Sequence, residues 1–455
     1  MCLAVSSSVY VDYLTVGPEA LAIERRQLAA TGRLTEEVAT DLDALREDLS
    51  RDDVDPTTPA HRQRARSLLD RCASLPDPRD DEPDGLDAIH AARPPGPRTL
   101  PVRDDARDHR DHLAGAWAGR VAGCFLGKPV ETWTRERIEA FLDATGQSLD
   151  GYLRADLAGS DGFDLDATGG WVDRDERVRD DDIDFTVAAL ETLRRVGSSV
   201  TTEDLARTWL TQLPAGALHT AERVAYRNLL DGVDPPETAT SRNPYRELIG
   251  AQIRGDCYGY VAPGAPEKAA ALAHRDARLS HVRNGLYGAM WVAATLAAVP
   301  ATESVCDALN VGLTEVPADS RFAAAVETVL SWCDAGIAYE TALARVHDAW
   351  DDADFYEGYH VLPNAQVVAA VLAWESASGP DLSRALARAV RAGFDTDCNA
   401  ATVGSVLGCA LGRDVVASTW TDRFEEGVPT ALAGRPCPTI DWLATETAAV
   451  ADRLG

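Results

Sequence analysis

Two clusters of acidic residues carry the side chains best suited to chemistry in this chain. One occupies residues 180–184 and the other residues 395–397, and each leads into a segment with helical periodicity. We therefore expect each cluster to open a helix. Carboxylate and hydroxyl oxygens suit Mg²⁺, Mn²⁺ or Ca²⁺ better than Zn²⁺. Together the clusters predict a divalent-metal site that draws ligands from both.

The spacing of Asp395 and Asp397 sets a geometric condition on such a site. Side chains two residues apart point to different sides of a regular helix, so these two converge only where the backbone is still turning into it. Gly393 provides a turn of that kind. Helix capping is the alternative, and it can coexist with metal binding. A cap needs one acidic residue, whereas the two clusters hold six, whose repulsion a cation would relieve.

Composition bounds the class of protein. The chain has 455 residues and 45% hydrophobic content, enough for one large domain with an accessory part. Its net charge is -29, and of 44 basic residues only Lys128 and Lys268 are lysines. Such a surface suggests adaptation to high salt, which screens the self-repulsion. It also argues against nucleic acid and anionic membranes as partners.

The cysteines and the apolar segments indicate a cellular location. The nine cysteines are scattered without a C-x-x-C motif, so we expect them to be reduced. The N-terminal residues lack a basic region, and no apolar run reaches the length needed to span a bilayer. A cytoplasmic protein is expected.

The order of patterns along the chain predicts three parts. Helical periodicity at residues 18–31, 34–49 and 58–74 indicates an N-terminal helical extension over residues 1–75, with a short strand at 6–16. Residues 76–108 are rich in proline and aspartate, and we interpret them as a linker. Residues 109–455 form the predicted main domain. Few strand-like runs interrupt its helices, so we expect an all-α fold. The predicted helices are 112–127, 183–196, 202–213, 219–231, 266–279, 285–299, 318–335, 338–350, 363–378, 381–392 and 398–412.

Two of these helices carry small residues at every fourth position. Glycine recurs in this way from residue 115 to residue 127, and alanine or glycine does so from 400 to 412. Each glycine inside a helix costs ~1 kcal/mol relative to alanine, so the stripe requires a compensating contact. Membrane helix pairing is the alternative for this spacing, but Arg120 and Lys128 bound the first stretch. We expect the two helices to cross closely in the core, which would bring the segment after Gly127 near Asp395.

Three segments in this order resemble the ADP-ribosylglycohydrolase family, which includes the dinitrogenase-reductase-activating glycohydrolases. They are residues 119–131, 180–184 and 393–399, and the resemblance spans residues 110–415. It implies an all-helical fold and two Mg²⁺ or Mn²⁺ ions. It also implies cleavage of the bond between the anomeric carbon of a ribose and an acceptor.

The resemblance implies metal ligands, with two departures. Asp180 stands where the family usually has a hydroxyl, and so does Cys398, whose thiol binds hard ions poorly. Cys398 could instead be a small packed residue. The candidate ligands are Asp180, Asp181, Asp182, Asp395, Asp397 and Cys398.

The resemblance also implies catalytic and substrate-binding positions. Glu131 would act as general base or position the water, with a solvated loop carboxylate as the alternative, and Asp182 and Asp395 would join it in catalysis. Arg254 would clamp a phosphate, or else be exposed or paired with an aspartate. The loop at residues 280–288 would line the ligand site, although His281 could cap or pack instead, and aromatic side chains would stack on a base or fill the core. The candidate substrate-binding residues are Arg254, Tyr258, His281, Asn284, Gly285, Tyr287 and Phe394.

Three functions follow from this resemblance. The first is a hydrolase that releases ADP-ribose from an ADP-ribosylated protein. The second is a small-molecule N-ribosyl hydrolase, which the altered loop at residues 250–260 favours. The third is a non-catalytic member akin to the lens crystallins of the family, which the retained acidic clusters disfavour.

Overall fold

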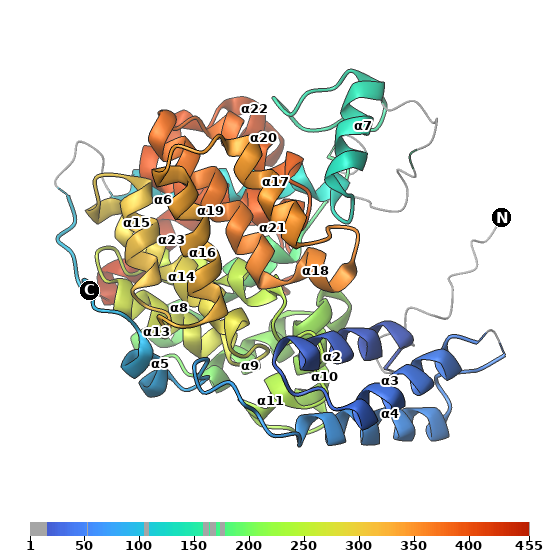
Figure 1. The fold of residues 1–455 in the computed structure, drawn as a ribbon. Helices are drawn as coiled ribbons and strands as arrows, with labels where there is room; N and C mark the ends of the chain where they lie inside the picture. Colours follow the sequence, from blue (N-terminus) through green and yellow to red (C-terminus); the bar gives the residue numbers. More distant parts are fainter. Residues whose placement is uncertain are drawn as a thin grey trace.

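The computed structural model describes residues 16–51, 53–103, 109–157, 163, 170–172 and 178–454. Within these ranges the chain forms helices and loops and no strand, apart from an isolated bridge between Leu248 and His360. The all-α prediction is confirmed (Figure 1). The strand predicted at residues 6–16 lies outside the described residues except at its last position. No helix in the described part of the chain has the length and apolar character to cross a bilayer.

Three helices make up the N-terminal extension: α2 (Pro18–Ala30), α3 (Glu36–Leu49) and α4 (Pro59–Ala73). They match the predicted helices closely, and Thr35 and Thr58 cap α3 and α4 by accepting from backbone N–H groups. Figure 1 shows the three lying side by side at the edge of the molecule. Their apolar side chains form a separate small core, which includes Leu21, Leu42 and Leu69.

The segment predicted as a linker runs along the main domain. Residues 86–92 form α5 (Leu86–Ala92), and Ile89 is buried in the core of the main domain. The carboxylate of Glu82 is buried and accepts from the guanidinium of Arg321 at 2.7 Å. The backbone N–H of Leu100 donates to the carbonyl of Gly264 at 2.7 Å. These contacts connect the extension to the rest of the fold.

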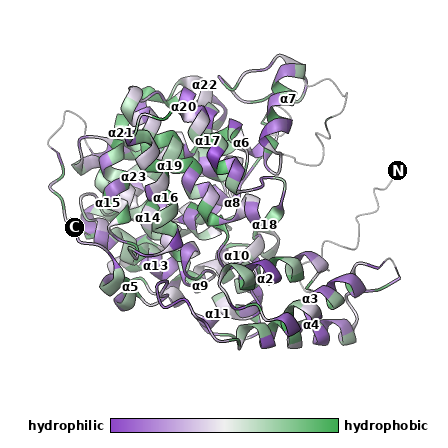
Figure 2. Ribbon diagram, viewed as in Figure 1, coloured by the Kyte–Doolittle hydropathy of each residue, from purple (hydrophilic) through white to green (hydrophobic). Residues whose placement is uncertain are grey.

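Every predicted helix of the main domain is present, with ends within a few residues of those expected. Figure 2 shows interior helices such as α14 and α19 largely in the hydrophobic colour, whereas α3 and α4 are mixed. The α-helices are α6 (His109–Gly127), α7 (Arg135–Thr145), α8 (Asp181–Val196), α9 (Thr202–Gln212), α10 (Thr220–Leu230), α11 (Glu237–Thr240), α12 (Asp256–Tyr260), α13 (Pro266–Ala277), α14 (Asn284–Ala298), α15 (Val305–Leu313), α16 (Arg321–Asp334), α17 (Tyr339–Ala349), α18 (Phe355–Tyr359), α19 (Val361–Ser378), α20 (Leu382–Arg391), α21 (Thr396–Leu411), α22 (Ser418–Thr421) and α23 (Ile440–Leu454). Short 3-10 turns include η1 (Lys128–Val130) and η4 (Ile249–Arg254).

Helices α6 and α21 cross at the centre with their backbones in contact, as their small-residue stripes predict. A Cβ added at Gly119 would overlap the carbonyl oxygen of Gly404, and one at Gly115 would overlap that of Gly408. At the end of the crossing, the hydroxyl of Thr396 donates to the carbonyl of Gly127 at 2.9 Å. The chain that follows α6 is thereby held beside the start of α21.

Candidate active site

The two acidic clusters meet where α8 and α21 begin. Asp182 lies in the first turn of α8, and Asp397 and Cys398 lie in the first turn of α21. One ligand atom from each of these three residues lies within 4.8 Å of the others. The thiol of Cys398 donates to Oδ2 of Asp182 at 3.2 Å. The convergence expected from the sequence is therefore present.

A second group of carboxylates adjoins the first. Glu131 follows η1 at the end of α6, and its oxygen lies within 4.8 Å of ligand atoms of Asp395 and Asp397. Asp397 thus belongs to both groups. Two neighbouring ligand sets that share a carboxylate, one all-oxygen and one that includes the thiol of Cys398, are an arrangement able to hold two divalent ions.

The backbone before α21 explains how Asp395 and Asp397 come together. Gly393 and Phe394 have φ of 74° and 58°, and Asp395 has φ of -85° and ψ of 88°, so Asp395 stands just before the helix. A Cβ at Gly393 would lie 2.6 Å from Oδ2 of Asp352. Only glycine fits this turn, which confirms the role expected of Gly393.

Capping and ligand geometry are divided between the members of the first cluster. Oδ1 of Asp180 accepts from the N–H of Asp182 at 2.8 Å and caps α8, while Oδ2 accepts from the ammonium of Lys128. Both oxygens of Asp180 are therefore engaged within the protein. Asp181 lines the adjoining pocket but is not part of the close groups.

Burial and mutual repulsion disfavour ionisation of the carboxylates. Burial, opposed by Lys128 and reinforced by Asp395, raises the pKa of Glu131 to about 7. Burial and neighbouring carboxylates likewise raise the pKa of Asp182 and of Asp397. Bringing these groups together without added positive charge is unfavourable.

The cations of the protein offset this charge only in part. Lys128 keeps the pKa of Asp180 below its usual range despite burial, and its Nζ lies 3.5 Å from Glu131 and 3.9 Å from Asp397. Arg120 contacts Asp182 but shares its charge with Asp256, 3.1 Å away. Six carboxylates face these two cations: Glu131, Asp180, Asp181, Asp182, Asp395 and Asp397.

One carboxylate oxygen, on Asp395, supports the binding of a cation at this site. Oδ1 of Asp395 is buried and has no hydrogen-bond partner among the residues that the structure describes. A buried acceptor left unpaired is costly, and a bound cation would satisfy it. Together with the excess of carboxylates, this atom makes the residues present a suitable set for Mg²⁺ or Mn²⁺.

A cavity of about 640 Å³ opens onto these carboxylates. The extension contributes residues 17–20 to its lining, at the start of α2. Tyr359 of α18 also lines it, and burial together with the charges of Glu131 and Asp395 raises the pKa of its hydroxyl. Sequence reasoning missed these residues, as well as His219 and Arg223, because none lies in a motif.

Arg254 does not line this cavity. Its Nε donates to Asp276 at 2.7 Å, and its Nη1 contacts Glu222, which does line the cavity. The guanidinium also lies over the rings of Phe185 and Trp209, at 5.3 and 5.0 Å. The structure thus shows the carboxylate-paired alternative that the sequence left open.

The other predicted aromatic and histidine residues are also set back from the cavity. Tyr258 is buried in the core, and His281 is buried beside Ser280, 2.8 Å away. Phe394 packs on His347 with ring centroids 4.7 Å apart. The structure does not bring these side chains into the lining.

The start of α14 contacts the segment at residues 76–108 and Glu247 instead. The amide of Asn284 donates to Glu247 at 2.7 Å and to Glu82 at 3.1 Å. The hydroxyl of Tyr287 donates to the carbonyl of Pro83 at 2.7 Å. Gly285 packs against the backbone of Arg246, since a Cβ added at this glycine would lie 2.9 Å from the carbonyl oxygen of Arg246.

Comparison of the sequence with known families identifies the family of this chain. The family model described as ADP-ribosylglycohydrolase matches residues 105–453. The chain belongs to this family. A solved structure described as an ADP-ribosylglycohydrolase-related protein complex is similar to 76% of this chain and 99% of its own, with 18% sequence identity and a TM-score of 0.44. No curated protein sequence matches. Membership in the ADP-ribosylglycohydrolase family supports a glycosyl hydrolase activity.

Proposed function

We propose that this ADP-ribosylglycohydrolase family member is a divalent-metal-dependent hydrolase that releases ADP-ribose from an ADP-ribosylated acceptor. The observation that carries the proposal is the pair of ligand groups that share Asp397 at the base of a cavity. The orphaned oxygen of Asp395 supports it. Asp182, Asp395, Asp397 and Cys398 would hold Mg²⁺ or Mn²⁺, and we propose two ions.

The reaction is hydrolysis at the anomeric carbon of the ribose. When bound, the ions would orient the ribose hydroxyls and lower the pKa of a water molecule. Glu131 would accept a proton from the attacking water, because its carboxylate lies beside Asp395 and Asp397 at the cavity. The water oxygen bonds to the anomeric carbon, and the bond to the acceptor breaks with its electron pair. The acceptor leaves with the proton, and the surrounding carboxylates stabilise the oxocarbenium-like charge.

A small-molecule N-ribosyl hydrolase is the second candidate. Two observations favour it: Arg254 is neutralised by Glu222 and Asp276, and residues 17–20 form part of the cavity lining. Because its charge is neutralised, Arg254 is no longer a candidate clamp for pyrophosphate. Residues 17–20 limit the room for a large acceptor. The retained carboxylates argue against a purely structural role akin to that of the crystallins.

A product assay separates these candidates. ADP-ribosyl-arginine, ADP-ribosyl-serine, ADP-ribose and nucleosides would be incubated in concentrated KCl with Mg²⁺ or Mn²⁺, and again with a chelator. We expect ADP-ribose to be released from an ADP-ribosylated acceptor, with loss of turnover on chelation. Turnover of nucleosides alone would favour the second candidate. Turnover that persists in chelator would contradict the proposed metal dependence.

Asp395→Asn tests the site itself. We expect it to lower activity by about 100-fold or more, because an amide is a poor ligand for a hard cation. The fold should persist because the two side chains have the same shape. Asp143→Asn, at an exposed position on α7, is the matched control. Retained activity in Asp395→Asn would remove Asp395 from the proposed site.

A further inference from the structure

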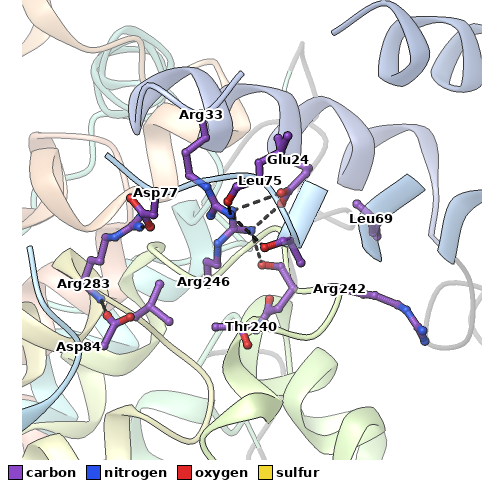
Figure 3. Close-up of a pocket in the computed structure, with 13 residues that line it drawn as sticks. Glu24, Arg33, Leu69, Leu75, Asp77, Asp84, Thr240, Arg242, Arg246 and Arg283 are labelled. Carbon is purple, nitrogen blue, oxygen red and sulfur yellow. Dashed lines mark hydrogen bonds and ion pairs between the residues drawn. The ribbon is translucent and has the colours of Figure 1, made fainter. Parts of the chain in front are cut away.

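A second cavity, of about 330 Å³, lies between the extension and the main domain. Figure 3 shows it lined by arginines from three parts of the chain. Arg33 follows α2, Arg242 and Arg246 precede η4, and Arg283 caps α14. In a chain with a net charge of -29, a gathering of arginines around one cavity is unexpected from composition alone.

Two of the four arginines are neutralised by carboxylates. Arg246 forms a two-point contact with Glu24, at 2.5 and 3.2 Å. Arg242 forms another with Asp70, at 2.7 and 2.9 Å. Bidentate geometry of this kind uses most of the donors of each guanidinium. Arg33 and Arg283 are less fully paired, although the carboxylates of Asp77 and Asp84 also line the cavity.

Arg33 makes no ion pair with the part of the chain that the structure describes. Its Nη2 donates to the carbonyls of Cys72, Ala73 and Leu75, at 3.3, 3.1 and 2.9 Å. Its Nε is buried and finds no hydrogen-bond partner within the described ranges. Burial, followed by repulsion from Arg246, lowers the pKa of Arg33. An added negative charge would relieve both effects.

Arg283 also has a buried donor nitrogen that its ion pair does not use. It pairs with Asp77 through one nitrogen. Its Nη1 is buried 3.6 Å from Glu247 and has no hydrogen-bond partner in the described part of the chain. Only 5% of the residue is exposed. Burial, followed by repulsion from Arg33 and Arg321, lowers the pKa of Arg283 to about 10. Figure 3 shows Arg33 reaching down to Arg246 and Arg283 reaching toward Asp77.

We propose that this cavity binds a small phosphate-bearing anion through Arg33 and Arg283. Guanidinium groups present pairs of N–H donors that match the oxygens of a phosphate. The volume is at the lower end of the range for small-molecule sites, which suits a phosphate carrying a small organic group. Nothing in the catalytic proposal requires this site, because its residues are separate from the metal ligands.

The position of α2 gives the site a consequence for catalysis. The start of α2 lines the catalytic cavity, Glu24 in its middle lines the anion cavity, and Arg33 follows its end. An anion held by Arg33 and Arg283 would fix the extension against the main domain. It would therefore fix residues 17–20 at the catalytic cavity. We expect anion binding to raise thermal stability and, if the proposed function holds, to change KM more than kcat.

Calorimetric titration of the full chain tests the site without reference to activity. The probes are inorganic phosphate, AMP and sulfate, at a constant KCl concentration. We expect saturable binding of phosphate or AMP to the wild-type protein. Tighter binding of AMP than of phosphate would identify an organic phosphate as the ligand class, and equal binding would identify the free ion. Absence of binding for all three probes would overturn the proposal.

Substitutions locate the binding. Arg33→Gln should weaken it about tenfold, and Arg33→Lys less, because lysine keeps the charge but lacks the fork. Arg391→Gln, at an exposed position on α20, is the matched control and should bind as the wild type does. Because Arg33 also contacts the end of α4, thermal unfolding of each variant would check folding, and Arg283→Lys provides an independent variant. If Arg33→Gln, Arg33→Lys and Arg283→Lys all bound the anion with wild-type affinity, the assignment would be overturned.

Discussion

Two buried aspartates at the candidate active site, Asp180 and Asp395, each have a structural role and a role in its charge balance. Asp180 both caps α8 and pairs with Lys128, so it orders the helix start and holds Lys128 beside the other carboxylates. Asp395 is held from its N–H by the side chain of Asn364 at 3.1 Å, and its Oδ1 is left unpaired. Positioning is thus achieved through the backbone and neighbouring side chains. The unpaired oxygen of Asp395, a residue that lines the cavity, lowers stability, and a bound cation would offset that cost.

His360 makes the fold sensitive to acid. Its Nδ1 accepts from the N–H of Leu362 at 3.2 Å at the start of α19, and its ring stacks on Trp350. Burial, followed by the charge of Arg321, lowers its pKa to about 3. The unfolded chain binds the proton near pH 6.5, so the contribution of His360 to stability is complete above that pH. It is lost as the pH falls toward 3, at about 1.4 kcal/mol per pH unit.

The variant His360→Asn isolates this effect, because asparagine keeps a capping oxygen and does not titrate. Urea unfolding from pH 7 to pH 4 measures it. We expect a shallower loss of stability in the variant than in the wild type. Parallel curves for the two proteins would show that His360 does not carry the proton linkage.

Among the helices, the crossing of α6 and α21 determines where the proposed catalytic groups lie. Glu131 follows α6 and Asp397 belongs to α21, so the distance between them depends on how closely the two helices approach. Larger side chains along either stripe would separate the backbones and spread the carboxylates. The small residues therefore matter for chemistry as well as for packing.

Gly119→Ala should destabilise the protein by about 3 kcal/mol, because the added methyl group would meet the backbone of Gly404, which cannot move aside alone. Gly151→Ala is the control, since no atom lies within 4 Å of its added Cβ. Chemical denaturation of both variants gives the comparison. A Gly119→Ala protein as stable as the control would contradict the close crossing.

The sequence predicts helices well where the pattern is long and periodic, and less well elsewhere. Helices α7, α15 and α23 were not predicted, although all three have apolar faces that pack into the core. The carboxylate site could be predicted because both clusters open helices that small residues bring together. The place of Tyr359 and of residues 17–20 in the cavity could not, because it depends on how α18 and the extension pack against the main domain. Arg254 shows the same limit, since its partners Glu222 and Asp276 lie on other helices.

The whole molecule carries a net charge of -29, and many of its arginines are already paired with carboxylates, as in the contacts of Arg194 with Glu191 and Glu446. We expect the melting temperature to rise as KCl is added, because salt screens repulsion between the unpaired acidic groups. Differential scanning calorimetry in increasing KCl would measure this, with an uncharged osmolyte as the control for solvent exclusion. A melting temperature no higher in concentrated KCl than in dilute buffer would contradict the proposed adaptation to high salt.

The contacts of residues 77–103 have a practical consequence for anyone who trims the gene to the region shared with the family. A protein that started at residue 105 would lack Glu82 and Pro83, so Asn284, Tyr287 and Arg321 would lose hydrogen-bond acceptors they now use. The apolar side chains that pack on Ile89 would be exposed to water. The large cavity would lose the part of its lining that residues 17–20 supply. The region that matches the family, residues 105–453, is shorter than the part of the chain that packs together. Deletion studies should therefore begin from the intact polypeptide.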